Sequence, residues 1–232
     1  MNHVQYDEWA RYIQKVAVTY GSNVKSILDV SCGTGTLCLK LEKYGYCIFG
    51  CDQSMEMAKK ATAKATAWKS ARKFFCAEMT LSPVKSQVDM VISLYDSINY
   101  LRNDLQWCQC LNNIYANLKV DGLFVFDVST LYNSMYVFKN YIHREANGEA
   151  SYFRRSSFFK KSQIQKTEFE IKFRSKPGTV FYESHQQRIR SLDDIERLIA
   201  SSKLTKIAAH DGFTFYPGSE KSERVHFILK KL

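Results

Sequence analysis

Short apolar runs alternate with amphipathic segments over the first 130 residues, and this alternation constrains the fold more than any other feature of the sequence. The apolar runs are five to seven residues long and rich in β-branched and aromatic side chains, and they cover residues 26–30, 47–52, 73–77, 88–94 and 123–128. Helices are expected from about Thr36, over 55–68 and over about 104–118. Apolar strands separated by helices are typical of a parallel sheet that is buried on both faces. The pattern therefore predicts a doubly wound α/β sheet.

A different pattern begins after Asp127. Alternating or aromatic-rich stretches over residues 150–160, 165–174 and 180–189 indicate antiparallel strands, joined by turns such as the Lys-Pro-Gly at 176–178. These strands interrupt the alternation of strands and helices, so we expect them to form an inserted sheet.

The end of the chain returns to the first pattern. A helix is expected near Leu192 with Ser191 as its N-cap, followed by two last strands near 206–215 and 225–230. No repeat, low-complexity tract or linker marks a second independent domain. We therefore expect one domain over residues 1–232, built on a mainly parallel seven-stranded sheet with an antiparallel sheet inserted into it.

Positive charge is concentrated in the inserted segment. The chain carries 33 Lys or Arg against 23 Asp or Glu, a net charge of +10. Between Lys139 and Lys176 there are ten Lys or Arg and four Glu, a surplus of six. This surplus suits a phosphorylated small molecule, a nucleotide-sugar or RNA, and it equally suits strand positions that face water. An anionic small-molecule partner is thus compatible with the sequence, and nucleic acid is not favoured.

No segment indicates export, membrane insertion or a metal site. No apolar run approaches the roughly 18 residues that span a bilayer, and the first twelve residues mix charged and aromatic types unlike a secretory leader. Cys108 and Cys110 lack the spacing and the second ligand pair of a zinc site, so they are expected to pack within a helix. Reduced, buried thiols are expected at Cys32, Cys38, Cys47, Cys51 and Cys76. The protein is therefore expected to be cytosolic.

The strand at residues 26–30 runs almost directly into Gly33-Thr34-Gly35, after which a helix begins. Glycines at such a turn let the backbone bend sharply and approach a ligand closely, because a Cβ atom would block it. The third glycine of the dinucleotide-binding fingerprint is absent, and so is the Gly-Lys-Ser/Thr of a phosphate-binding loop. The turn therefore favours neither pyrophosphate nor triphosphate binding.

Asp52 ends the second expected strand, about twenty residues after the glycines. A carboxylate at this position can accept hydrogen bonds from both hydroxyls of a ribose. Its alternative role is to cap the helix that follows Ser54. In combination with Gly33 and Gly35, the ribose-binding role is favoured.

These motifs resemble those of the class I S-adenosylmethionine-dependent methyltransferases. The first motif of that family commonly reads Asp-x-x-x-Gly-x-Gly and is matched by Asp29, Gly33 and Gly35. Residues 50–57 are similar to its second-strand motif, and residues 89–94 to its fourth strand. The resemblance spans the whole chain. It implies a Rossmann-like fold, S-adenosylmethionine as the cofactor and methyl transfer as the reaction.

The resemblance also implies a set of cofactor-binding residues. Glu78 falls where the family usually places an acidic residue on the adenine amine, although Asp is more usual there. Tyr6 and Trp9 resemble a Tyr-x-x-Trp pair that closes over the cofactor. The cofactor-binding residues implied in this way are Tyr6, Trp9, Asp29, Ser31, Gly33, Thr34, Gly35, Asp52, Gln53, Met55, Glu78, Met79 and Leu94.

Residues 95–101, 122–127 and 183–188 are similar to a narrower subgroup of small methyltransferases. This subgroup has an antiparallel insertion after the fifth strand and includes nucleotide-amino-sugar N-methyltransferases, with glycine N-methyltransferase as a more distant relative. The resemblance implies that residues 131–190 form a cap on the substrate side. Members also carry a further amino-terminal segment that closes over the substrate, and we expect the present sequence to begin after it. Arg190 stands where they often have an aromatic residue.

His185 and Asp96 are the candidate catalytic residues. A methyl transfer requires the acceptor to be held in line with the bond that breaks, and a neutral His or a carboxylate can accept its proton. His185 lies on an inserted strand expected to overhang the carboxyl ends of the sheet, where ligands bind in open α/β folds. A purely structural His is an equally good interpretation. Asp96 follows the fourth strand and either orients the acceptor or caps a turn.

Three hypotheses on function remain. The favoured one is a methyltransferase that modifies a nitrogen or oxygen of a small polar metabolite. The first alternative is an RNA or protein methyltransferase that uses the basic insertion, and the second is a partner subunit that binds the cofactor without turnover. A dehydrogenase is disfavoured because the third glycine of its fingerprint is missing.

Overall fold

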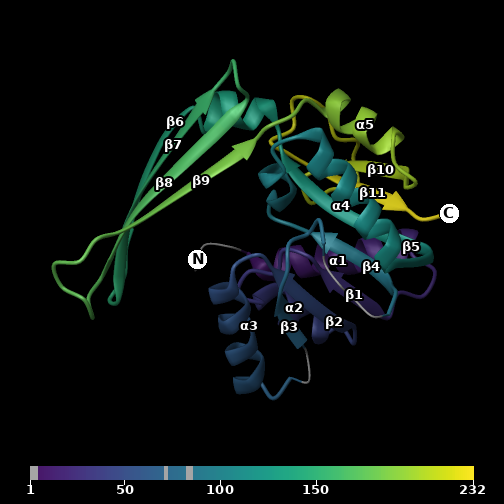
Figure 1. Cartoon of the computed structure of the whole chain (residues 1–232), viewed down its shortest axis with the longest axis horizontal. Helices are drawn as coiled ribbons and strands as arrows, with labels where there is room; N and C mark the ends of the chain where they lie inside the picture. Colours follow the sequence, from purple (N-terminus) through teal and green to yellow (C-terminus); the bar gives the residue numbers. More distant parts are fainter. Residues whose placement is uncertain (1–4, 71–72, 82–85) are drawn as a thin grey trace.

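The computed structural model describes residues 5–70, 73–81 and 86–232 (Figure 1). A seven-stranded sheet has the strand order β10-β11-β5-β4-β1-β2-β3. Strands β1 to β5 pair in parallel, whereas β11 runs antiparallel to both β5 and β10. The strands are β1 (Ser26–Asp29), β2 (Cys47–Asp52), β3 (Lys73–Cys76), β4 (Val88–Ser93), β5 (Leu118–Ser129), β10 (Thr205–Asp211) and β11 (Arg224–Lys230). The predicted Rossmann-like, mainly parallel sheet is confirmed.

Helices cover both faces of this sheet, because successive side chains of each strand point to opposite sides. Leu28 packs in a core with α4 and α5, and its neighbour Ile27 packs in a second core with α1 and α2. Burial on both faces explains why the strands are continuous apolar runs. The helices are α1 (Tyr6–Tyr20), α2 (Thr36–Glu42), α3 (Met55–Ala67), α4 (Asp104–Asn117) and α5 (Leu192–Ala200).

Helices α3, α4 and α5 begin at polar side-chain caps that the sequence supplies. The hydroxyl of Ser191 accepts a hydrogen bond from the backbone N–H of Asp194, so the expected N-cap of α5 is confirmed. Ser54 caps α3 in the same way through the N–H of Met57. A short 3₁₀ helix, η1 (Ser97–Tyr100), follows β4, and a π-helical turn, η2 (Asn133–Val137), follows β5.

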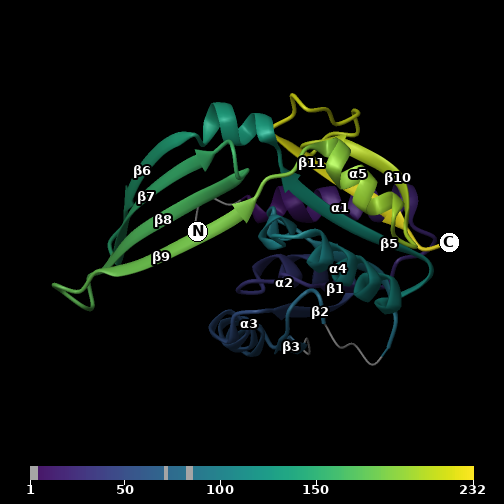
Figure 2. The ribbon, with the colours of Figure 1, turned by 45° about the horizontal axis from the view of Figure 1, so that its top comes forward.

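A second sheet is inserted between β5 and α5. It is an antiparallel meander with the order β6-β7-β8-β9. Figures 1 and 2 show that its strands project away from the helices, with only one end close to the seven-stranded sheet. Its strands are β6 (Asn140–Ala146), β7 (Ala150–Phe159), β8 (Ile164–Phe173) and β9 (Phe181–Arg188).

Several local expectations need correction. Helix α1 and strand β6 were not predicted, and β10 ends at Asp211 rather than near 215. Strand β5 begins at Leu118, inside the segment expected to be helical, because Leu118 pairs in parallel with Val88 of β4. Cys76 is exposed rather than buried, since it ends the edge strand β3.

Candidate active site

The turn after β1 is held in a conformation that needs glycine. Gly33 and Gly35 have φ angles of 53° and 72°, a region that other L-residues enter at a cost. A Cβ atom at Gly35 would lie 3.0 Å from Ala61 Cβ and from Phe74 Cζ, so this glycine allows α3 to pack closely. A Cβ atom at Gly33 would meet no atom within 4 Å. The backbone of Gly33 therefore borders open space, as the approach of a ligand requires.

Asp29 lies buried beneath this turn. One carboxylate oxygen accepts a hydrogen bond from the N–H of Ser31 at 3.0 Å, and the other accepts one from the Cys38 thiol at 3.6 Å. Burial raises the pKa of Asp29 to about 7, against the lowering effect of these hydrogen bonds. Because Asp29 is only 3% exposed, its carboxyl group supports the turn from beneath through the Ser31 hydrogen bond.

Asp52 joins the ends of two neighbouring strands. Its Oδ2 accepts a hydrogen bond from the N–H of Gly33 at 2.9 Å, and its Oδ1 accepts one from the N–H of Ser54 at 2.9 Å. Ser54, not Asp52, caps α3, so the alternative role of Asp52 as the N-cap is excluded. The carboxylate ties the glycine turn to the end of β2 while remaining partly exposed.

Other predicted cofactor residues surround these strand ends. Gln53, Met55 and Glu78 are exposed, and Ser31, Thr34 and Met79 are partly buried. The Thr34 hydroxyl accepts a hydrogen bond from Lys64 Nζ at 3.1 Å. Glu78 Oε2 accepts a hydrogen bond from the Thr80 hydroxyl at 3.3 Å. Leu94, directly after β4, is 5% exposed and belongs to the core beside α1 and α2.

Helix α1 brings two predicted residues to the same region. Trp9 is buried, with its ring 5.9 Å from Tyr95 and 4.8 Å from Phe213. Burial raises the pKa of Tyr6, and the nearby Tyr95 and Asp29 raise it further. The helix thus places Tyr6 near the buried carboxyl group under the glycine turn.

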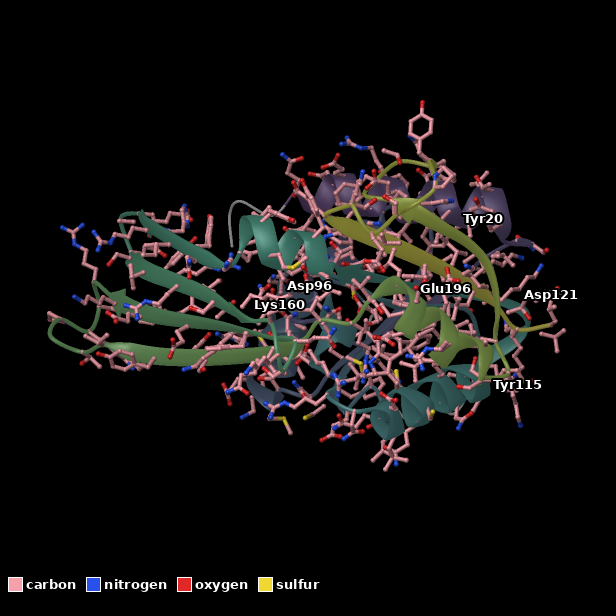
Figure 3. All side chains as sticks on the ribbon, turned by 90° about the horizontal axis from the view of Figure 1, so that it is seen from above. Tyr20, Asp96, Tyr115, Asp121, Lys160 and Glu196 are labelled. Atoms are coloured by element: carbon pink, nitrogen blue, oxygen red, sulfur yellow. The ribbon has the colours of Figure 1, made fainter. Side chains whose placement is uncertain are left out.

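Asp96 belongs to a polar network at the carboxyl end of β4. Its Oδ2 accepts a hydrogen bond from Gln187 Nε2 at 2.6 Å, and its Oδ1 lies 3.0 Å from Nη2 of Arg224. Arg224 also pairs with Asp127, whose Oδ2 accepts the N–H of Asp96 at 2.8 Å. Figure 3 labels Asp96 where the two sheets meet.

The backbone at this position is strained. Tyr95 and Asp96 have φ angles of 64° and 49°, two consecutive residues in the left-handed region. Such conformations persist only where surrounding contacts enforce them, and they cluster at functional sites. Here the Asp96 contacts hold the turn, and the Arg224 guanidinium lies 5.6 Å from the Tyr95 ring.

His185 on β9 points to η1. Its Nδ1 lies 2.9 Å from the Tyr100 hydroxyl, and its Nε2 lies 3.5 Å from the Glu183 carboxylate on the same strand. Burial raises the pKa of Tyr100 well above its ordinary value, so this side chain is a neutral phenol. The two candidate catalytic residues therefore lie at one junction between the sheets. His185 belongs to β9, and Asp96 is hydrogen-bonded to Gln187 of the same strand.

Sequence patterns alone do not single out Arg224, Gln187 or Arg154. Arg224 could have been inferred only from topology: β11 is antiparallel to β5, so its first residue lies at the edge where the parallel strands end. Gln187 and Arg154 lie in an alternating pattern whose two faces differ little in polarity. Their importance depends on which face turns toward the seven-stranded sheet.

One face of the four-stranded sheet, which we call the inner face, contacts the loop after β4 through His185 and Gln187. Register places Gln187 and His185 on it, together with Thr167, Phe169, Arg154 and Tyr141. Of the ten basic residues between Lys139 and Lys176, Arg154 alone lies on the inner face. Arg144, Arg155, Lys166 and Lys172 lie on the opposite, outer face, and the others lie in or beside turns. Most of the positive surplus thus points away from the junction.

No helix within the described ranges is long and apolar enough to cross a membrane. Among the same residues, no group of three or more His, Cys, Asp and Glu side chains is arranged to hold a metal ion.

Comparison with known proteins shows that the chain is similar to methyltransferases. A family model described as a methyltransferase domain matches residues 27–122. The whole chain is 35% identical to a protein of Geobacillus sp. (strain WCH70) that carries the name methyltransferase, and it covers 95% of that protein. The alignment spans the whole chain, so it includes both sheets.

Solved structures share the fold at lower identity. An S-adenosylmethionine-dependent methyltransferase from Clostridium acetobutylicum has a TM-score of 0.88 and 22% identity, over 99% of this chain and 93% of that one. CalS10 from Micromonospora echinaspora, an amino pentose methyltransferase solved with S-adenosylmethionine bound, has a TM-score of 0.78 and 14% identity, over 100% and 93%.

Proposed function

Because the chain belongs to the class I S-adenosylmethionine-dependent methyltransferases, we propose that it transfers the methyl group of this cofactor to a nitrogen or oxygen of a small polar metabolite. The observation that carries the proposal is the junction of the two sheets. Two hydrogen bonds, Tyr100–His185 and Asp96–Gln187, hold the inner face against the edge at which the parallel strands end. The Gly33 turn lies at the same edge. An acceptor bound where these surfaces meet would be of limited size.

The residues around the glycine turn fit the cofactor. A carboxylate oxygen offers about two acceptor positions, and one on each Asp52 oxygen is taken by a backbone N–H. A second position on each oxygen remains for the two hydroxyls of a ribose. Open space at Gly33 admits the cofactor close to the backbone, and Glu78 would accept a hydrogen bond from the adenine amine. Tyr6 and Trp9 would close the site from α1.

When bound, S-adenosylmethionine supplies a methyl group made electrophilic by the adjoining sulfonium. The chain must orient the acceptor, exclude water and remove a proton. We assign proton removal to Nε2 of His185. Nδ1 would then carry hydrogen and donate to the Tyr100 oxygen, and the Glu183 carboxylate near Nε2 would stabilise the proton once it is taken.

Asp96 receives a different role in this proposal. Both of its oxygens already have partners, Gln187 on one and Arg224 on the other. A carboxylate engaged in this way is better placed to orient a neighbouring group than to abstract a proton. We therefore propose Asp96 as a positioning residue that sets the approach of β9 to the cofactor edge.

Calorimetric titration with S-adenosylmethionine and S-adenosylhomocysteine tests the cofactor site. We expect Asp52→Ala and Gly33→Val to abolish binding in proteins that remain folded. Gly45→Val is the matched control, because Gly45 also has a positive φ, of 90°, and a Cβ atom there would also meet nothing within 4 Å. It should lose stability but keep the cofactor. Equal loss of binding in all three variants would contradict the assignment.

Transfer of a labelled methyl group tests the acceptor. The purified protein is offered a panel of small polar amines and alcohols, total RNA and a protein extract in parallel. The proposal expects label in small molecules. Label confined to RNA or protein would favour the first alternative, and cofactor binding with no transfer to any acceptor would favour a partner subunit without turnover.

A further inference from the structure

Arg154 is the one residue among the ten Lys and Arg between Lys139 and Lys176 that lies on the inner face. Register pairs it with His143 of β6 and Phe169 of β8, on the inner face. It is partly buried, whereas its neighbour Arg155 is exposed on the outer face. Two adjacent arginines of one strand thus lie on opposite faces of the sheet.

Aromatic rings surround the Arg154 guanidinium. Its central carbon lies 5.0 Å from the centre of the Phe138 ring, 5.3 Å from that of Tyr141 and 5.7 Å from that of Phe169. These contacts stabilise the charge through the faces of the rings and keep water from part of the group. They satisfy none of its N–H donors.

No hydrogen bond or ion pair joins Arg154 to another residue in the described part of the chain. Its Nε is buried and has no acceptor. A buried donor without an acceptor costs about 1–3 kcal/mol, so such groups generally have a partner that is bound from outside or a functional reason to persist. Arg224, which also lies at the junction, is paired with two carboxylates.

The position of Arg154 relates it to the candidate active site. Its charge lowers the pKa values of Tyr95 and Tyr100, and in both it offsets part of the rise caused by burial. Tyr95 belongs to the strained turn after β4, and Tyr100 holds His185. The unpaired guanidinium therefore acts within the same region as the proposed base.

We propose that Arg154 binds an anionic group of the acceptor, a carboxylate or a phosphate. This inference rests on the proposed function, because it assigns the acceptor to the inner face. A guanidinium offers parallel N–H donors that match either anion, and rings on several sides strengthen the pairing by excluding water. The acceptor would then be a small amine or alcohol that also carries a negative charge.

Nuclear magnetic resonance of protein labelled with ¹⁵N-arginine tests this site directly. The Nε–H resonance of Arg154 is assigned by its absence in Arg154→Gln. Acetate and inorganic phosphate are then added separately, with chloride at matched ionic strength as the reference. We expect a saturable shift of this resonance with at least one anion, and the stronger binder identifies the class of acceptor group.

Two variants separate recognition from general charge. Arg154→Lys keeps the charge and should weaken anion binding about tenfold or more, since the paired donors are lost. Because this variant lacks the Arg154 resonance, its binding is measured from the backbone amide resonances of inner-face residues in uniformly ¹⁵N-labelled protein. Arg155→Gln, on the outer face, should leave the affinity unchanged. A resonance that responds no more to acetate or phosphate than to chloride would overturn the proposal.

Calorimetry with S-adenosylhomocysteine distinguishes the remaining outcomes. We expect Arg154→Gln to bind it as the unmodified protein does. If the variant folds but loses this binding, Arg154 holds the carboxylate of the cofactor, and the acceptor proposal is wrong. Because the anion titration needs no cofactor, failure of the unmodified protein to bind S-adenosylhomocysteine would count against the cofactor site alone.

Discussion

The Tyr100 hydroxyl lies 2.9 Å from Nδ1 of His185, although 85 positions separate the two residues in the sequence. Tyr100 ends the turn that follows β4, and His185 lies in the middle of the inserted strand β9. The hydrogen bond therefore joins the seven-stranded sheet to the four-stranded sheet. It also fixes the orientation of the imidazole, so that Nε2 faces away from the phenol.

The first prediction concerns this pair. His185→Gln should lower kcat by about 10² to 10⁴, the range for loss of a positioned base. It should also abolish the increase of kcat with pH that a general base produces. Tyr100→Phe should have a smaller effect, because it removes only the group that orients the ring. The measurement is the pH profile of methyl transfer to an acceptor found by the panel. His143→Gln is the control, since His143 shares the inner face and contacts Tyr152 instead. An unchanged profile in His185→Gln would assign the proton to another group.

The second prediction concerns the Arg224 network. Arg224→Met should destabilise the fold by about 3 kcal/mol, because Asp127 is fully buried and would keep a charge without its cation. Lys206→Met, which breaks the more exposed pair with Glu196, should cost less than about 1 kcal/mol. Urea unfolding measures both. The double variant Arg224→Met, Asp127→Leu should recover much of the lost stability. Equal losses of stability in Arg224→Met and Lys206→Met would contradict the prediction that breaking the buried pair costs more than breaking the exposed one.

The third prediction addresses the outer face. Its cations alternate with Glu168 and Glu170 across the sheet, so the local surplus is partly balanced. We expect only weak binding of single-stranded RNA, and we expect a combined Arg144→Gln, Arg155→Gln and Lys172→Gln variant to keep its methyl transfer rate. Binding is measured at increasing salt. Tight binding whose affinity falls steeply with salt, together with loss of transfer in this variant, would favour an RNA substrate.

The parallel core could be predicted from the sequence because its determinants are local. Ile27 and Leu28 serve opposite faces of one strand, so burial on both sides produces an apolar run that needs no knowledge of its neighbours. The glycine turn and Asp52 could be predicted because each lies at a fixed distance from the end of a predicted strand. Strand β6 escaped prediction because its half-buried side chains, Tyr141, His143 and Glu145, are polar or amphipathic and leave no clear apolar alternation.

The polar network at the junction could not be predicted in the same way. Asp96 lies 128 positions from Arg224 and 91 from Gln187, and nothing in the local sequence pairs them. The role of Arg154 depends on the register of β7, since a shift of one residue would place Arg155 on the inner face instead. Such relationships arise only once the strands are paired.

The fourth prediction concerns stability and pH, through two buried groups with opposite effects. Burial raises the pKa of Asp29 from an ordinary value of 3.8 to about 7, and it lowers the pKa of His226 from 6.5 to about 3. Between pH 4 and pH 7 the folded state holds the Asp29 proton that the unfolded state has released, so this group makes stability fall as pH rises. Between pH 3 and pH 6.5 the unfolded state protonates His226 while the folded state does not, so this group makes stability rise with pH.

The two contributions oppose each other between about pH 4 and pH 6.5, each with a slope of at most about 1.4 kcal/mol per pH unit. Asp29→Asn should therefore gain stability relative to the unmodified protein as pH increases through this window. His226→Phe, which suits the aromatic neighbours Trp9 and Phe213, should lose relative stability over the same window, because it removes the rising contribution. Urea unfolding at several pH values measures both differences. If both difference curves are flat while the exposed variant Glu196→Gln is also flat, burial does not shift these groups in the folded protein. Opposite slopes would establish that the carboxyl group under the glycine turn is held neutral at low pH, and that raising the pH charges it beneath the cofactor site.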